Sequence, residues 1–311
     1  MKARAFIAAA LLCVLSAVAS AQTHPIRIVV PVPPGGSLDT TARLIASRWQ
    51  ARGTAVYIEN KPGANTLIGA ELVAHSPADG YTLLYASTPL VIAPFQQKTA
   101  FHPDSIAPVV QVLVETFGLV SGKSGELDST DAIARLAASR PVNCIAVPGA
   151  PEIACEQLKS FLNGRVTVVP YQGLAPAITA LLGGHGDVMF SPMVSVVPHV
   201  RAGQARLLAV SSRAALPDDI APAPLVGDVW KGFVLDGFAG VFVPQGVPDE
   251  RVKQLNRELN EILREPEVRA AMQVNLQAPV GGAPELFGRN MQGAQARYRE
   301  VMTRLNLGVP R

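Results

Sequence analysis

The segment Ile26–Trp49 constrains the fold of this chain more than any other part of the sequence. Its first residues, Ile26–Val30, form a short apolar run that predicts a strand, and Pro31–Gly36 then predicts a tight turn. Ser37 occupies the position of an N-cap before an amphipathic pattern that predicts a helix. A strand, a Gly-Gly turn and a helix start direct unpaired main-chain N–H groups, and the positive end of the helix dipole, toward one point. The segment therefore predicts a site for a small anion.

Residues 1–21 have the three parts of a secretory signal peptide. Two basic residues supply the charged start, Phe6–Val18 supplies the apolar core, and small residues ending at Ala21 supply the cleavage site. An uncleaved membrane anchor is the alternative, but the apolar run is shorter than a membrane span requires. We therefore expect export to the periplasm, cleavage near Ala21 and a soluble mature chain.

The charge of the mature chain is nearly balanced. Removing the signal takes Lys2 and Arg4 from the 27 Lys and Arg residues and nothing from the 24 Asp and Glu residues. This balance gives no reason to expect nucleic acid or a membrane surface as a partner.

Strand-like and helix-like segments alternate along the mature chain, whose length of about 290 residues suits two domains. Aromatic residues make up 5% of the sequence, and small and aliphatic residues dominate, as in buried parallel strands with helices on both faces. The expected strands are 26–30, 56–59, 81–86, 107–114, 117–121, 143–147, 166–169, 188–190, 205–210 and 237–243. The expected helices are 38–49, 67–75, 129–139, 152–162, 176–182, 249–264, 266–274 and 284–305.

Two similar strands, Phe117–Ser121 (FGLVS) and Phe238–Val243 (FAGVFV), flank one complete α/β module. They predict paired crossovers between a first lobe, residues 22–120 with 238–311, and a second lobe, residues 121–237. The expected fold class is α/β, with a mainly parallel sheet flanked by helices in each lobe and a ligand cleft between the lobes. A single continuous sheet is the alternative.

Two cysteines remain after the signal. Cys144 lies on an expected strand and Cys155 lies one turn into the following helix. A disulfide that closes this short loop, worth about 3 kcal/mol, and two buried thiols on facing surfaces both fit the pattern. Two cysteines without a nearby histidine do not make a zinc site, so no metal is expected.

Loops that leave the carboxyl ends of strands are expected to line the cleft. The first lobe offers the turn after its first strand, the loop Pro62–Gly69 and Ser87–Pro89, and the second lobe offers Val147–Glu152 and Pro170–Ala175. No arginine lies in these loops, so a carboxylate would be held by main-chain amides, hydroxyl groups and water. The candidate ligand-binding residues are Pro34, Gly35, Gly36, Ser37, Asp39, Asn65, Thr66, Ser87, Thr88, Gly149, Ala150, Glu152, Tyr171, Gly173 and Ser191.

Several of these candidates also fit a purely structural role. Ser37 can be a plain helix cap, which is compatible with ligand binding. A structural role is favoured for Asp39, because a first-turn acid suits the helix dipole and would repel an anionic ligand. Tyr171 fits packing and ligand contact equally well.

No catalytic set is recognisable, so a binding protein is favoured over an enzyme. Gly118–Ser124 has three residues between its glycines where a phosphate-binding loop has four. The sequence contains neither Gly-x-Ser-x-Gly nor His-Glu-x-x-His, and its five histidines lack the spacing of metal ligands. No cofactor is expected.

Ordered segments along the whole mature chain resemble the substrate-binding proteins of tripartite tricarboxylate transporters, the Bug family. The resemblance is carried by IRIVVPVPPGGSLDTTARLIA, IENKPGANTLIGAELVAHSPADGYTLL, VVPYQGLAPAITALLGGHGDVMF, PHVRAGQARLLAVSS and GVFVPQGVPDERVKQLNRELNEILREPEVRAAM. It implies a two-lobed periplasmic binding protein fold of type II that closes on a small carboxylate, often through ordered waters. It also implies delivery of that solute to a membrane permease.

The sequence departs from the family pattern at the expected cleft. VPGAPEIACEQL stands where the family usually has a Gly/Ser-rich segment with a histidine, which changes the expected anion contacts of the second lobe. Glu152 in this segment can pair with a ligand amine or can simply suit the helix dipole. Thr66-Leu67 replaces a more usual Gly-Asn or Gly-Thr, and Leu216–Val234 lacks the family's Pro-Thr-x-x-Glu-x-Gly string. These differences indicate an unusual ligand.

Three functions remain open at the level of the sequence. The first is a monomeric transport receptor that captures a small organic acid or amino acid for a tripartite tricarboxylate permease. The second is a solute sensor that presents the bound ligand to a membrane kinase. The third is an exported enzyme on the same fold, which the absence of a catalytic set disfavours.

Overall fold

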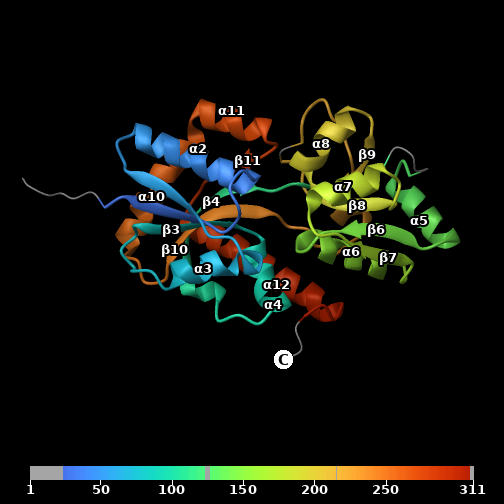
Figure 1. The fold of residues 1–311 in the computed structure, drawn as a ribbon, viewed down its shortest axis with the longest axis horizontal. Coiled ribbons are helices and arrows are strands. Elements are labelled where there is room, and N and C mark those ends of the chain that lie inside the picture. The colour runs from blue at the N-terminus through green and yellow to red at the C-terminus, as the bar shows by residue number, and fades with distance from the viewer. Residues whose placement is uncertain (1–23, 123–126, 215, 309–311) are drawn as a thin grey trace, which may run out of the picture.

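The computed structural model describes residues 24–122, 127–214 and 216–308, so the predicted signal peptide lies outside the described residues. These residues form two lobes, each built on its own β-sheet, that lie side by side along the longest axis of the molecule (Figure 1). Within the described ranges, we find no helix that is both long and apolar enough to cross a membrane.

The sheet of the first lobe has the strand order β11-β4-β10-β3-β1-β2. β1 pairs in parallel with β2 and β3, whereas β10 pairs antiparallel with both β3 and β4. β2, β1, β3 and β4 therefore run in one direction, and β10 runs against them. The strands are β1 (Ile26–Val30), β2 (Val56–Asn60), β3 (Thr82–Ser87), β4 (Ile106–Val114), β10 (Phe238–Pro244) and β11 (Ala278–Pro279).

The sheet of the second lobe has the order β7-β6-β8-β5-β9, which repeats the order β2-β1-β3-β10-β4 of the first. β6 pairs in parallel with β7 and β8, and β5 pairs antiparallel with β8 and β9. The two strands that are similar in sequence, β5 and β10, thus hold equivalent places as the antiparallel strand within each sheet. The strands are β5 (Phe117–Gly122), β6 (Val142–Ala146), β7 (Val166–Pro170), β8 (Val188–Pro192) and β9 (Ala205–Val210).

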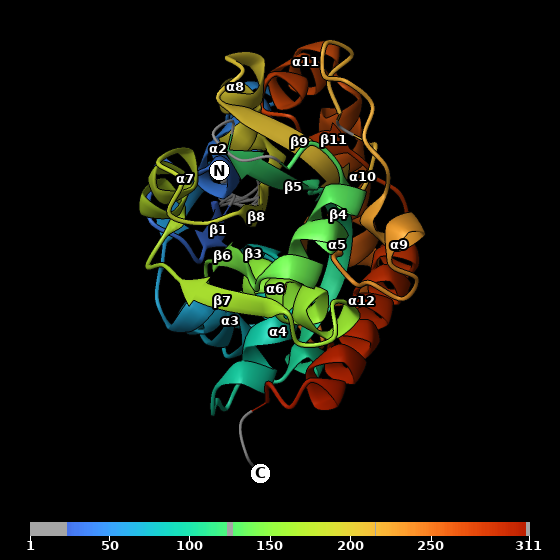
Figure 2. The ribbon, with the colours of Figure 1, turned by 90° about the vertical axis from the view of Figure 1, so that its right-hand side faces the viewer.

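Helices cover both faces of each sheet. On the first sheet, α2 and α11 lie above and α3, α4 and α12 lie below in Figure 1, and α10 packs on the α2 face. On the second sheet, α5 and α6 cover one face and α7 and α8 the other (Figure 2). The helices are α2 (Ser37–Ala51), α3 (Leu67–Ala74), α4 (Pro89–Gln96), α5 (Thr130–Ser139), α6 (Ala150–Phe161), α7 (Leu174–Leu182), α8 (Met193–Arg201), α9 (Val226–Val229), α10 (Asp249–Arg264), α11 (Pro266–Val274) and α12 (Pro284–Arg304).

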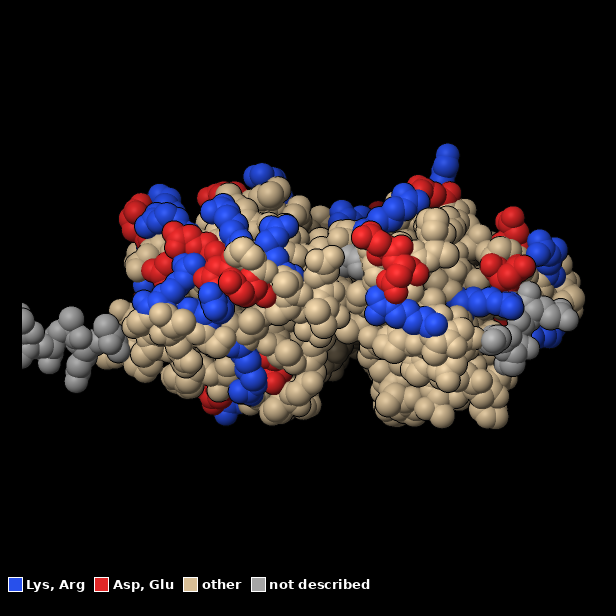
Figure 3. All heavy atoms as spheres, turned by 90° about the horizontal axis from the view of Figure 1, so that it is seen from above, with Lys and Arg blue, Asp and Glu red and all other residues tan. Residues whose placement is uncertain are grey.

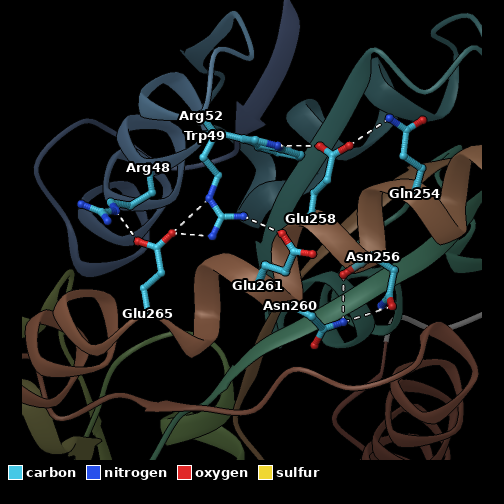
Figure 4. A network of polar contacts seen from close by, with 9 residues as sticks. All are labelled: Arg48, Trp49, Arg52, Gln254, Asn256, Glu258, Asn260, Glu261 and Glu265. Carbon is cyan, nitrogen blue, oxygen red and sulfur yellow. Dashed lines mark hydrogen bonds and ion pairs between the residues drawn. The ribbon is translucent and has the colours of Figure 1, made fainter.

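A polar network holds the far end of α2 against α10 (Figure 4). Trp49, which is buried, donates from its indole Nε1 to Glu258 at 2.7 Å. Arg52 pairs with Glu261 at 2.8 Å and with Glu265 at 2.6 Å, and Arg48 also pairs with Glu265. Each partly exposed ion pair contributes little by itself, so the apolar contact around Trp49 supplies most of the stability here. The network fixes the helix whose first turn faces the second lobe.

The chain crosses between the lobes at two segments that lie in contact, Glu115–Thr116 and Asp236–Gly237. The Glu115 N–H donates to the Gly237 carbonyl at 2.9 Å. A Cβ on Gly237 would lie 2.5 Å from the Glu115 carbonyl oxygen, so only glycine allows this approach. Because β4 runs parallel to β1 and β3 and leads into the second lobe, the carboxyl ends of these strands all point toward that lobe.

Most expected elements are present within two residues of their predicted bounds, but some predictions are wrong. The prediction that Ser87–Pro89 opens a loop is wrong, since Pro89 begins α4, and proline fits the first position of a helix. α8, α9 and β11 were also not expected. Ser37 is the first residue of α2 and not its N-cap, because Gly36 takes the extended N-cap conformation with no side-chain cap.

Cys144 and Cys155 form a disulfide that joins β6 to α6, with Cα atoms 5.9 Å apart. Of the two alternatives that the sequence left open, the structure therefore has the bonded one. Both residues are fully buried. The bond fixes the helix that follows the turn Pro148–Gly149 in the second lobe.

Candidate ligand-binding site between the lobes

The turn between β1 and α2 is held by one buried carboxylate. Asp39 accepts hydrogen bonds from the Gly35 N–H at 2.9 Å, from Arg43 Nε at 2.8 Å and from Asn60 Nδ2 at 2.8 Å. Asn60 also donates to the Val32 carbonyl at 3.1 Å, which ties the turn to the end of β2. Burial would raise the pKa of Asp39, but the hydrogen bonds from Arg43, Asn60 and Gly35 outweigh it and hold this pKa at about 2. Asp39 is therefore a charged brace for the turn.

This brace changes the expected role of the main-chain amides. The turn was predicted to present unpaired N–H groups, but the Gly35 N–H is not one of them, because it donates to Asp39. Gly35 has φ +92°, so the turn still requires glycine there. The first-turn N–H groups of Ser37 and Leu38 have no acceptor within their own helix. These two groups, and not the Gly35 N–H, are therefore the donors that the turn can offer to an anion.

A cavity of about 410 Å³ lies beside this turn, at the carboxyl ends of β1, β3 and β4, and is called the cleft cavity below. Four of the candidate residues line it, namely Pro34, Gly36, Ser37 and Ser87. Its other lining residues are Val32, Pro33, Leu38, Leu113, Glu115, Ala239 and Gln277. Its size falls in the range of about 300–1,000 Å³ that is typical of small-molecule sites.

Glu115 is the one ionisable residue among those that line the cleft cavity. Burial raises the pKa of its carboxyl group to about 7. Tyr85, two residues before Ser87 on β3, lies near Glu115 and Thr41, and burial raises the pKa of its phenol far above the usual range. The Tyr85 hydroxyl is buried and has no hydrogen-bond partner among the described residues. Thr41 instead donates to Gln277 Oε1 at 2.8 Å.

The loop before α3 is strained. Ala64, Asn65 and Thr66 have φ values of 46°, 49° and 81°, a run of left-handed residues without glycine. Such conformations cost roughly 1–3 kcal/mol each and gather at functional sites. Asn65 is exposed and its amide contacts Gln96 at 3.3 Å, whereas the buried Thr66 hydroxyl has no partner in the described chain. Thr66 is therefore the stronger candidate of the two.

The candidates of the second lobe lie at the equivalent ends of β6, β7 and β8, outside the set that lines the cleft cavity. Gly149 and Gly173 are the N-caps of α6 and α7, with φ values of 100° and 116°. Burial and the neighbouring Glu156 raise the pKa of Glu152, while a hydrogen bond from the Gly149 N–H opposes them. In both lobes, therefore, a carboxylate from the first turn of a helix accepts a hydrogen bond from a main-chain N–H of the preceding turn: Glu152 from Gly149 here, and Asp39 from Gly35 in the first lobe.

Three other candidates are buried or packed. Tyr171 packs against the apolar core below α7 and is partly buried. Ser191 is fully buried, with its hydroxyl 3.4 Å from the Pro192 carbonyl. Thr88 is buried as well and accepts from the Phe238 N–H at 2.9 Å, which ties the start of α4 to the second crossing segment.

Figure 3 shows a notch between the lobes, and the surface that borders it is mostly uncharged. A cavity of about 830 Å³, the outer cavity, lies between α11 of the first lobe and Ala214 and Leu216–Asp219 of the second. Gln277 lines both this cavity and the cleft cavity. A third cavity of about 330 Å³, the crossing cavity, borders both crossing segments and α12. Glu115 lines both the crossing cavity and the cleft cavity. Of these three cavities, only the cleft cavity is bordered by the turn between β1 and α2.

Sequence reasoning missed Glu115, Tyr85 and Gln277. A signal existed for Glu115, since it is the one charged residue in the apolar stretch from Val109 to Gly122. Tyr85 reads as an ordinary apolar strand residue, and Gln277 reaches the cavity through the position of α11, so neither had a local signal.

The comparisons with known proteins agree with the two-lobed fold. The model of the tripartite tricarboxylate transporter family receptors matches residues 42–307. Protein BugT of Bordetella pertussis is 30% identical, with 87% of each chain covered. A Rhodopseudomonas palustris protein solved with adipate is 25% identical with a TM-score of 0.79, covering 93% of this chain and 99% of its own. MatC from the same organism, solved with bound malate, is 26% identical with a TM-score of 0.71, covering 89% and 98%.

These matches confirm the predicted family and the two-lobed α/β fold. They also confirm that the protein is not an enzyme, because the family is one of solute-binding receptors. The chain belongs to the tripartite tricarboxylate transporter receptor family, the family of the Bug proteins.

Proposed function

We propose that this protein is a periplasmic receptor that captures a small carboxylate-bearing solute between its lobes and delivers it to a tripartite tricarboxylate permease. The observation that carries the proposal is the cleft cavity of about 410 Å³ at the start of α2, in a chain of this receptor family. The adipate and malate bound by two structural relatives are both small carboxylates and support this ligand class.

The carboxylate would lie against the first turn of α2. The N–H groups of Ser37 and Leu38 and the positive end of the helix dipole favour a negative group there. The hydroxyl groups of Ser37 and Ser87 and the amide of Gln277 add neutral donors around the same cavity. The Asp39 brace keeps the turn in place before the ligand arrives, so little ordering is required on binding.

The second lobe would close over the bound solute. We assign residues 22–120 with 238–311 to the first lobe and residues 121–237 to the second, with a cleaved signal ending near Ala21. The second-lobe contacts would come from Gly149, Ala150, Glu152, Tyr171, Gly173 and Ser191, joined by Asn65 and Thr66 of the first lobe. Ligand favours closure only through contacts that exist in the closed form, and the permease would recognise that form of the monomer.

A thermal-shift screen of the mature protein with di- and tricarboxylates, amino acids and aromatic acids tests the proposal. A ligand at one hundred times its dissociation constant adds about 2.7 kcal/mol to stability. Gly36→Val should abolish that shift while the ligand-free protein keeps its melting temperature, because Gly36 lines the cavity and a Cβ there meets nothing within 4 Å.

The matched control is Gly227→Val on α9, where a Cβ likewise meets nothing within 4 Å. This control should bind as the wild type does. No shift with any member of the panel, or full binding by Gly36→Val, would contradict the proposed site.

A further inference from the structure

An unpaired carboxylate stands at the junction of two cavities. Glu115 follows the last residue of β4, and it lines both the cleft cavity and the crossing cavity. Its side chain makes no hydrogen bond and no ion pair within the described part of the chain. A partly buried charge without a partner is unfavourable and calls for an explanation.

The neighbours of Glu115 do not neutralise it. In the crossing cavity, Arg297 is already paired with Asp236 at 2.7 Å, and Arg289 forms no ion pair with Glu115 within the described part of the chain. On the cleft side, the set of lining residues contains neither lysine nor arginine. The buried Tyr85 lies close to Glu115, but its phenol is neutral and therefore does not neutralise the carboxylate either.

The other acid near the turn differs from Glu115 in this respect. Asp39 is fully compensated by Arg43, Asn60 and the Gly35 amide. The cleft cavity therefore has two different ends. The start of α2 favours a negative group, whereas the Glu115 carboxylate favours a positive one. A plain dicarboxylate would bring a second negative group toward Glu115, and one of the two carboxylates would have to take up a proton.

We propose that the solute of this receptor carries a cationic nitrogen as well as a carboxylate, with its ammonium group donating to Glu115 and its carboxylate at the first turn of α2. This inference rests on the proposed function and specifies the ligand class. An ammonium group has three donors, which suits the Glu115 carboxylate. Because both charges come from one small molecule, the cavity would bind it without any added basic residue.

Calorimetry with matched ligand pairs tests the inference on the mature protein at pH 8. Suitable pairs are succinate and aspartate, glutarate and glutamate, adipate and 2-aminoadipate, and 3-phenylpropionate and phenylalanine, in which the members differ by one ammonium group. For the pair that fits the cavity, we expect the amine-bearing member to bind at least tenfold more tightly. Glu115→Gln keeps the shape of the side chain and removes its charge. It should therefore lower the affinity for the amine-bearing member at least tenfold and leave the affinity for the plain acid unchanged or higher.

The control is Glu300→Gln, an exposed residue of α12, which should leave every affinity unchanged. Tighter binding of the plain acids by the wild type would overturn the inference and leave the proposed function intact. An amine-bearing ligand that Glu115→Gln binds as well as the wild type would overturn it too. If no member of any pair bound to the folded wild type, both the inference and the proposed function would fail.

Discussion

Ionisation of Glu115 should destabilise the ligand-free protein as the pH rises from about 4.5 to 7, and Glu115→Gln should remove this contribution. Burial raises the pKa of Glu115 from 4.5 to about 7 in the folded protein. A group whose folded pKa is raised stabilises the fold fully below its unfolded pKa, and this contribution disappears as the pH rises through the folded pKa. The window for the loss is therefore about pH 4.5 to 7.

The size of the effect follows from the shift. Each pKa unit corresponds to about 1.36 kcal/mol, which sets an upper bound of about 3.4 kcal/mol. Glu115 is only partly buried and borders two open cavities, so solvent screening reduces the expected loss to about 1.5–2 kcal/mol. Glutamine cannot ionise, so the variant should gain this amount over the wild type at pH 8 and nothing at pH 4.5.

Urea unfolding of both proteins between pH 4.5 and 8, followed by tryptophan fluorescence, measures the difference. The two tryptophans, Trp49 and Trp230, report on one lobe each. All other ionisable groups are common to both proteins, so their contributions cancel in the difference. Parallel stability curves for the two proteins would refute the reasoning that Glu115 is an uncompensated carboxylate.

Two further changes test the local structure. Asp39→Asn should lower stability at pH 7 by about 1–2 kcal/mol, because it weakens the bonds to Gly35 and Arg43, and circular-dichroism melts should show the difference shrinking as the pH falls from about 4 toward 2. An equal difference at every pH would contradict the lowered pKa of Asp39. Replacing both Cys144 and Cys155 by alanine should cost about 3 kcal/mol in unfolding experiments, from the short loop that the bond closes. Dithiothreitol should lower the melting temperature of the wild type to that of the double variant, and a wild type indifferent to reductant would count against the bond.

The fold could be predicted from the sequence because its signals are local. The first strand and turn of Ile26–Gly36, the prolines that begin α11 and α12, and the similarity of β5 to β10 each show in a few residues. α4 was not predicted because Ser87-Thr88-Pro89 has the composition of a loop. Only the packing of the folded chain shows that Pro89 starts a helix with a buried face.

The site was predictable only in its main-chain part. The position of the turn before α2 followed from its glycines. The hydrogen bond from the Gly35 N–H to Asp39 could not be predicted in this way, because Asp39 is held in place by Asn60 at the end of another strand. Gln277 reaches the cavity because α11 packs beside α2. Such contacts join residues far apart along the chain, and no pattern within one sequence window contains them.

The strand order has a consequence for how the protein is made. β10 lies in the interior of the first sheet, between β3 and β4, yet Phe238 follows its partner Thr88 by 150 residues. All strands of the second sheet, by contrast, have been synthesised once β9 ends at Val210. A chain that emerges from its amino terminus can therefore complete the second lobe first, while β3 waits with an unpaired apolar edge. The lobe that holds the turn before α2 is the last to mature, so protection of this edge becomes a requirement of biogenesis.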